Sequence, residues 1–100
     1  MKRLGLLLLL LCPRLAAPAR AGSTSYCNPA IETRIAGEFN GWDDEFIYKM
    51  TNGEIWQQSN YHYHYHYAYR PEVVIYPTSH GCHIKVDGDN DEGVDVVRIK

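Results

Sequence analysis

The chain reads Tyr61-His62-Tyr63-His64-Tyr65-His66-Tyr67-Ala68-Tyr69 across its middle, an alternation of two kinds of side chain with a period of two. Because successive side chains of an extended strand point to opposite faces, this segment predicts a strand. One face would carry five tyrosines, and the other would carry three histidines and an alanine. No other part of the chain is as regular, and the segment indicates a fold made of strands.

Short runs of alternating or apolar residues, separated by turn residues, predict further strands on both sides of this segment. We expect strands at residues 31–39, 45–50, 54–58, 61–69, 72–76, 82–86 and 94–99. Asn52-Gly53 is a strong hairpin signal, because both residues tolerate a positive φ. About seven short strands and no helix favour an all-β fold, a small antiparallel barrel of SH3-like or OB-like kind that hides its edges. A two-sheet sandwich is the alternative.

The first 21 residues have the pattern of a secretory signal peptide. Lys2 and Arg3 precede an apolar run at 4–11, and small residues follow. The run is about half as long as a membrane-spanning helix requires. We therefore expect cleavage after Ala21 and a secreted or periplasmic protein. A lipoprotein signal at Cys12 is a weaker alternative, because a bulky leucine precedes that cysteine instead of a small residue.

The remaining residues, 22–100, are expected to form an N-terminal arm at 22–30 and a single β domain at 31–100. They hold six basic and twelve acidic side chains, which gives a net charge of −6 with histidines neutral. This charge argues against nucleic acid as a partner, because phosphate recognition needs a basic face. Neither a glycine-rich phosphate loop nor a nucleophile motif is present, so we do not expect an enzyme.

Two cysteines, Cys27 and Cys82, remain after the predicted leader. Thiols oxidise outside the cytosol, so an even number of cysteines favours a disulfide. The bridge would close a loop of about 55 residues and restrict the unfolded chain by about 4 kcal/mol. Two separate thiols are the alternative.

Short motifs occur along the chain from Glu32 onward, and their combination looks specific. They are Ile35-x-Gly37-Glu38-Phe39-x-Gly41-Trp42, Asn52-Gly53-x-Ile55-Trp56-Gln57-Gln58, the tyrosine alternation, Arg70-Pro71, Lys85-Val86-Asp87-Gly88 and Arg98-Ile99. The pattern resembles a family of small bacterial secreted or domain-sized modules of unknown function. The resemblance implies a bacterial β-rich module and supplies no activity. In that family the positions between the tyrosines are usually small or hydroxylated, with a histidine at the place of His66, so His62 and His64 depart from it.

The histidine face offers imidazole ligands for zinc or copper. Neighbouring histidines on one strand face lie about 6.6 Å apart, so two can reach one ion with bonds of about 2.1 Å, but three in a row cannot without strain. At most two of His62, His64 and His66 are therefore expected on one ion. Further ligands would be His80, His83 or a carboxylate. A solvated histidine face is the favoured alternative, and a buried, hydrogen-bonded His66 is another.

The tyrosine face has two interpretations. Buried rings would bring five hydroxyls that need partners, whereas exposed rings would form a surface for sugar rings, peptide or protein. We favour a mixture, with some rings inside and some at the rim, because the strand is long for a small barrel. Trp42 and Trp56 either extend the surface or, as the sequence favours, belong to the core.

The predicted function is a secreted binding or structural module without catalytic activity, with an unknown protein, peptide or glycan as partner. Its contact surface would consist of Tyr61, Tyr63, Tyr65, Tyr67, Tyr69, Trp42 and Trp56. Zinc or copper binding by the histidine face is the alternative function.

Residues 87–93 have the Asp-x-Asp-x-Asp spacing of a calcium loop at Asp87, Asp89 and Asp91. The EF-hand pattern fails at its sixth position, which is Glu92, and at its twelfth, which is Arg98. A hairpin loop rich in turn-forming residues is therefore favoured, and weak calcium binding is the alternative.

Overall fold

The computed structural model describes residues 24–44 and 46–100, and these residues form strands and connecting loops without a helix. The predicted leader lies outside the described residues. The strands are β1 (Ile31–Arg34), β2 (Glu38–Trp42), β3 (Ile47–Lys49), β4 (Ile55–Gln58), β5 (His64–Tyr69), β6 (Glu72–Thr78), β7 (Gly81–Val86) and β8 (Val94–Arg98). The prediction of an all-β protein is confirmed.

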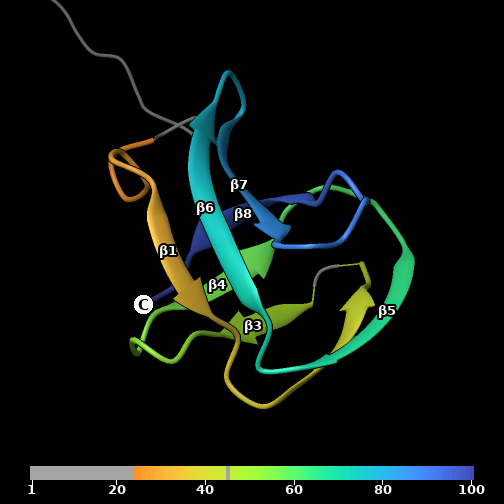
Figure 1. Cartoon of the computed structure of the whole chain (residues 1–100). Helices are drawn as coiled ribbons and strands as arrows, with labels where there is room; N and C mark the ends of the chain where they lie inside the picture. Colours follow the sequence, from red (N-terminus) through yellow and green to blue (C-terminus); the bar gives the residue numbers. More distant parts are fainter. Residues whose placement is uncertain (1–23, 45) are drawn as a thin grey trace, which may run out of the picture.

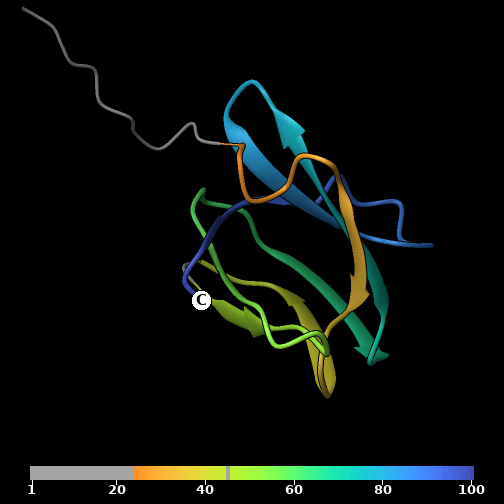
Figure 2. The same ribbon diagram turned by 90° about the vertical axis from the view of Figure 1, so that its left-hand side faces the viewer.

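Six of the strands form one antiparallel sheet in the order β1-β6-β7-β8-β4-β3, and it curls into a half-barrel (Figures 1 and 2). A bridge between Ile35 and Met50 brings the two ends of this sheet together beyond β1 and β3. The other two strands, β2 and β5, pair in a separate ribbon, which Figure 1 shows on the side of the molecule away from β1. The half-barrel fits the barrel prediction, and its SH3-like or OB-like kind stays a prediction.

The ribbon exists because the strand predicted at 31–39 is broken. Gly37 has a φ of +87°, a conformation that favours glycine, and its carbonyl accepts a hydrogen bond from Arg70 N–H at 2.8 Å. The chain therefore turns between β1 and β2. The Asn40-Gly41 pair lies inside β2, where an irregularity in the register between Phe39 and Gly41 lets the strand follow β5.

The hairpin predicted at Asn52-Gly53 joins β3 and β4. Of the two residues only Gly53 has a positive φ, +95°. The side chain of Asn52 instead accepts a hydrogen bond from the backbone N–H of Glu54 at 2.9 Å. The turn thus lies where the sequence predicts it, but only one of its two central residues has the positive φ that a type I′ turn requires.

The core lies inside the half-barrel and consists mainly of aromatic and β-branched side chains, together with two cysteines and a methionine. Its buried apolar members are Cys27, Ile35, Phe39, Trp42, Tyr48, Met50, Trp56, Val73, Ile75, Cys82, Ile84, Val86, Val94 and Val96. Trp42 and Trp56 are only 2% and 0% exposed, so their inclusion in a contact surface is wrong. Trp42 packs edge-on against Phe39 and Tyr48, with centroid distances of 4.8 and 5.1 Å.

The predicted disulfide between Cys27 and Cys82 is confirmed. It fixes the segment before β1 to β7, and both cysteines belong to the core cluster. The bridge therefore anchors the N-terminal arm to the middle of the six-stranded sheet.

Candidate functional site

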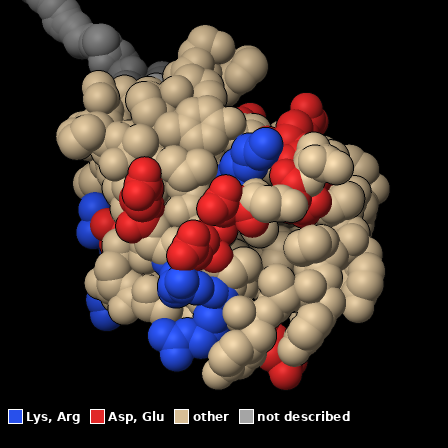
Figure 3. Space-filling model, in the orientation of Figure 1, with Lys and Arg blue, Asp and Glu red and all other residues tan. Residues whose placement is uncertain are grey.

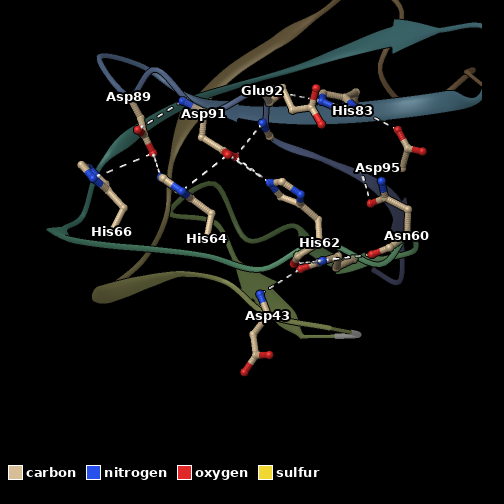
Figure 4. Close-up of polar contacts among 12 residues, drawn as sticks. Asp43, Asn60, His62, His64, His66, His83, Asp89, Asp91, Glu92 and Asp95 are labelled. Atoms are coloured by element: carbon tan, nitrogen blue, oxygen red, sulfur yellow. Dashed lines mark hydrogen bonds and ion pairs between the residues drawn. The ribbon is translucent and has the colours of Figure 1, made fainter.

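The predicted alternation persists over residues 61–69, and the structure assigns its two faces. All five tyrosines are exposed, from 51% for Tyr67 to 77% for Tyr65. The histidines are half-buried and point toward the loop between β7 and β8 (Figure 4). Two predictions are therefore wrong: that some of these tyrosines lie inside the fold, and that the histidines form a solvated face. Other aromatic side chains fill the core, and carboxylates cover the histidines.

Residues 87–93, the loop between β7 and β8, carry these carboxylates. Gly93 has a φ of +85°, and a Cβ atom there would overlap the carbonyl oxygen of Ile84, so the loop packs directly on β7. The N–H of Gly93 donates to Asp91 Oδ2 at 3.0 Å, and the N–H of Asp91 donates to Asp89 Oδ1 at 3.3 Å. These bonds orient two carboxylate side chains that are only 11% and 9% exposed.

His62 and Asp91 form the first contact between the strand and the loop. His62 Nε2 lies 3.0 and 3.2 Å from the two carboxylate oxygens. Burial by itself raises the pKa of Asp91, but the hydrogen bonds from His62 and from the N–H of Gly93, with the charge of the nearby histidines, lower it below 3.8. Asp91 is therefore ionised at neutral pH, and both of its oxygens are engaged.

The next two histidines converge on Asp89 (Figure 4). One potential ligand atom each from His64, His66 and Asp89 lies within 4.8 Å of the other two. His64 Nε2 is 3.2 Å and His66 Nδ1 is 3.9 Å from Asp89 Oδ2. The two imidazole rings stack with 12° between their planes.

This convergence leaves two polar atoms without a hydrogen bond. His64 Nε2 and Asp89 Oδ2 are close enough for an ion pair, yet both are buried and neither has a hydrogen-bond partner among the described residues. Most buried polar atoms in folded proteins are hydrogen-bonded, so two neighbouring buried atoms that lack a hydrogen bond require an explanation.

The structure separates the other predicted ligands from this group. His80 is exposed in the turn between β6 and β7. His83 binds elsewhere, with Nδ1 2.8 Å from Asp95 Oδ1 and Nε2 2.7 Å from the carbonyl oxygen of Glu92. Of the further ligands expected beside two of the strand histidines, only a carboxylate, that of Asp89, lies next to them.

The predicted calcium ligands are not brought together. Asp87 is exposed, whereas Asp89 and Asp91 turn to the histidines. Within residues 24–44 and 46–100, the group at His64 is the only cluster of three potential metal ligands.

Gln58 positions the start of the Tyr/His segment, and the sequence analysis missed it. Its side chain is 1% exposed. Its Oε1 accepts from the N–H of Asp43 at 3.2 Å and from the hydroxyl of Tyr48 at 3.3 Å. Its Nε2 donates to the carbonyl oxygens of Asn60 and His62, each at 3.0 Å. The alternation along β4 could have revealed this role, because Gln58 lies on the same strand face as the buried Trp56.

We expect Gln58→Leu to reduce the free energy of unfolding by about 2–3 kcal/mol, because the carbonyls of Asn60 and His62 lose a buried donor. Urea denaturation measures this loss. Gln57→Leu, at the half-buried neighbouring position, is the control and should change stability by less than about 1 kcal/mol. Equal effects of the two substitutions would contradict the positioning role of Gln58.

The tyrosine row, defined as Tyr61, Tyr63, Tyr65, Tyr67 and Tyr69, forms the outer face of the same segment. Tyr61 and Tyr63 contact each other edge-on, with ring centroids 5.3 Å apart. The carboxylate of Asp43, with a smaller contribution from Asp44, raises the pKa of Tyr63, so this hydroxyl stays neutral at physiological pH. The row presents its ring faces and hydroxyls to solvent.

No family model, curated protein or solved structure matches this chain. The resemblance to small bacterial modules therefore stays a prediction. Over the part of the chain that the structure describes, none of the elements is a helix with the length and apolarity needed to cross a membrane.

Proposed function

We propose that this protein is a secreted or periplasmic binding module without catalytic activity, and that it binds an extended peptide segment of a partner protein along β5. The exposure of the whole tyrosine row carries the proposal, because contiguous exposed aromatic surface marks interaction sites in soluble proteins. Tyrosine suits this role, since it supplies a large contact area with few rotatable bonds. The disulfide is consistent with an oxidising compartment.

The pairing of β5 favours a peptide over a glycan. Among the described residues β5 pairs with β2 on one edge and with no strand on the other. An unpaired edge offers backbone N–H and C=O groups to an incoming strand. A peptide added there would gain backbone hydrogen bonds and would place alternate side chains beside the tyrosine rings. A glycan would use the rings alone.

The charge around the tyrosine row favours a peptide with basic residues. Asp43 and Asp44 act on the hydroxyl of Tyr63 at one end of the row. The margin of the molecule where β5 lies is otherwise largely free of charged side chains in the view of Figure 3. An apolar stretch followed by a basic residue would complement this surface.

We expect random peptides displayed on phage to yield binders when they are selected against the secreted protein. The triple variant Tyr63→Ser, Tyr65→Ser, Tyr67→Ser should bind the selected peptides about tenfold or more weakly, because it removes the central rings. Methylation of alternate backbone nitrogens of a peptide should cause a similar loss, because it removes the strand-type hydrogen bonds. Fluorescence anisotropy of labelled peptides measures both effects.

Tyr26→Ser is the matched control, since Tyr26 is 57% exposed and lies outside the tyrosine row. It should leave peptide affinity within about twofold of the unmodified protein. The proposal fails if no peptide is selected, or if the selected peptides bind the triple variant normally. Tyrosine-dependent binding on a glycan array, in the absence of peptide binding, would assign the row to sugars instead.

A further inference from the structure

We propose that His64, His66 and Asp89 bind a divalent transition-metal ion of the zinc or copper class, and that the ion joins β5 to the loop between β7 and β8. The site lies on the face of β5 opposite the tyrosine row. It is therefore independent of peptide binding, and either proposal stands if the other fails.

The distances in the cluster suit a tetrahedral ion. Bonds of about 2.0–2.1 Å at tetrahedral angles place two ligand atoms about 3.3 Å apart. His64 Nε2 and Asp89 Oδ2 are separated by 3.2 Å, and His66 Nδ1 and Asp89 Oδ2 by 3.9 Å. The His64–Asp89 edge of the tetrahedron is thus already formed, and the His66–Asp89 edge needs a shift of about half an ångström, which is within side-chain motion. The third edge joins ligand atoms of His64 and His66 that lie within 4.8 Å of each other.

The unpaired atoms point to an ion rather than to a simple ion pair. In a His–Asp pair without metal, an imidazole N–H would donate to the carboxylate. His64 Nε2 and Asp89 Oδ2 do not meet the geometry of a hydrogen bond, although the Asp89 side chain is only 9% exposed. Two buried polar atoms that face each other without a hydrogen bond are costly in a metal-free protein. A shared cation would satisfy both atoms, and His66 would complete three protein ligands.

The surroundings of the ligands resemble the outer shell of established metal sites. A metal-bound histidine usually directs its other ring nitrogen to a carboxylate, which fixes the ring. His64 Nδ1 lies 3.5 Å from Asp91 Oδ1, and Asp91 is itself held by His62 and by the N–H of Gly93. Asp89 Oδ1 accepts from the N–H of Asp91, which leaves Oδ2 for the ion. Each ligand side chain except that of His66 is thus oriented by a further contact.

The donor set selects the class of metal. Two imidazole nitrogens and one carboxylate oxygen suit zinc, copper or nickel, whereas calcium and magnesium require oxygen ligands almost throughout. The cluster also explains why the aspartate spacing of residues 87–91 does not produce a calcium loop, since Asp89 and Asp91 are directed to histidines. With three protein ligands, a fourth position remains for water or another ligand.

We expect the untagged secreted protein, stripped with EDTA, to bind one zinc or copper ion with a submicromolar dissociation constant in isothermal titration at neutral pH. His64→Ala, His66→Ala and Asp89→Asn should each weaken binding about 100-fold, and Asp91→Asn about tenfold through the loss of ring orientation. His80→Ala is the matched control and should bind normally, because His80 is exposed outside the cluster. Bound metal should also raise the melting temperature of the protein, but not that of the ligand variants.

A second measurement does not depend on variant stability. Electron paramagnetic resonance of the copper-loaded protein should show coupling to two imidazole nitrogens, and melting curves in EDTA will show whether each variant is folded. The proposal is overturned if no ion binds more tightly than about 10 μM. It is equally overturned if the folded ligand variants bind as the unmodified protein does, or if copper shows no nitrogen coupling.

Discussion

The double variant Cys27→Ala, Cys82→Ala is expected to lose about 4 kcal/mol of its free energy of unfolding. The disulfide closes a separation of 55 residues, and its removal releases that restraint in the unfolded chain. The same change frees the segment before β1 from β7, where both cysteines are part of the core. A domain of this size has a total stability of about 5–15 kcal/mol, so the variant should be close to unfolding at 37 °C.

Urea denaturation of the oxidised protein, the reduced protein and the double variant separates the two contributions of the cysteines. The reduced protein keeps both sulfur atoms, so its loss reports the bridge, and the further loss in the variant reports packing. We expect the bridge to account for most of the effect. A loss below about 1 kcal/mol on reduction would contradict the prediction.

The period of two at residues 61–69 predicts a strand and the composition of its faces, but not which face turns inward. The predicted strand is also too long, because β5 begins at His64 and residues 61–63 precede it. Tyrosine and histidine are both amphipathic, so the choice depends on what the rest of the fold supplies. Phe39, Trp42 and Trp56 occupy the core. The loop at 87–93 supplies carboxylates to the histidine face. The orientation of the segment therefore depends on contacts with residues that are distant in the sequence.

The sequence predicts the histidines of the candidate metal site but not its aspartate. Strand geometry limits a single ion to two of the three histidines, and His64 and His66 are the two whose ring nitrogens lie together with Asp89. Asp89 was recognised only as part of a calcium pattern, because local spacing does not show which distant donors face a loop. The approach of this loop to β5 depends on the β7–β8 hairpin and on the tight packing of Gly93.

The predicted strand boundaries are wrong where a single glycine changes the direction of the chain. Alternation through residues 31–39 predicts one strand, yet the positive φ of Gly37 divides it. Glycine adopts such a conformation readily without requiring it, so the sequence does not distinguish a glycine within a strand from one at a corner. The corner has a structural consequence, because it allows β2 to leave the larger sheet and pair with β5.

Gly41→Ala is expected to reduce the free energy of unfolding by about 4–5 kcal/mol. Gly41 has a φ of +105°, and it faces the backbone of β5. A Cβ atom there would overlap the carbonyl oxygen of His64 and would lie 2.7 Å from the nitrogen of His66. Backbone atoms have little freedom to yield, so β2 and β5 must separate.

Gly53→Ala is the matched control, because Gly53 has a similar φ of +95° but nothing within 4 Å of an added Cβ atom. It should cost only the conformational strain, about 1–2 kcal/mol. Urea denaturation compares the two variants, and equal losses would show that the contact with β5 is not responsible.

Because Gly41 packs on the backbone of residues 64–66, the folded fraction of Gly41→Ala should also show amide chemical-shift changes across β5. These changes should affect the tyrosine row and the histidines of the candidate metal site together. Gly53→Ala, which lies in the β3–β4 turn, should leave those amide signals unchanged.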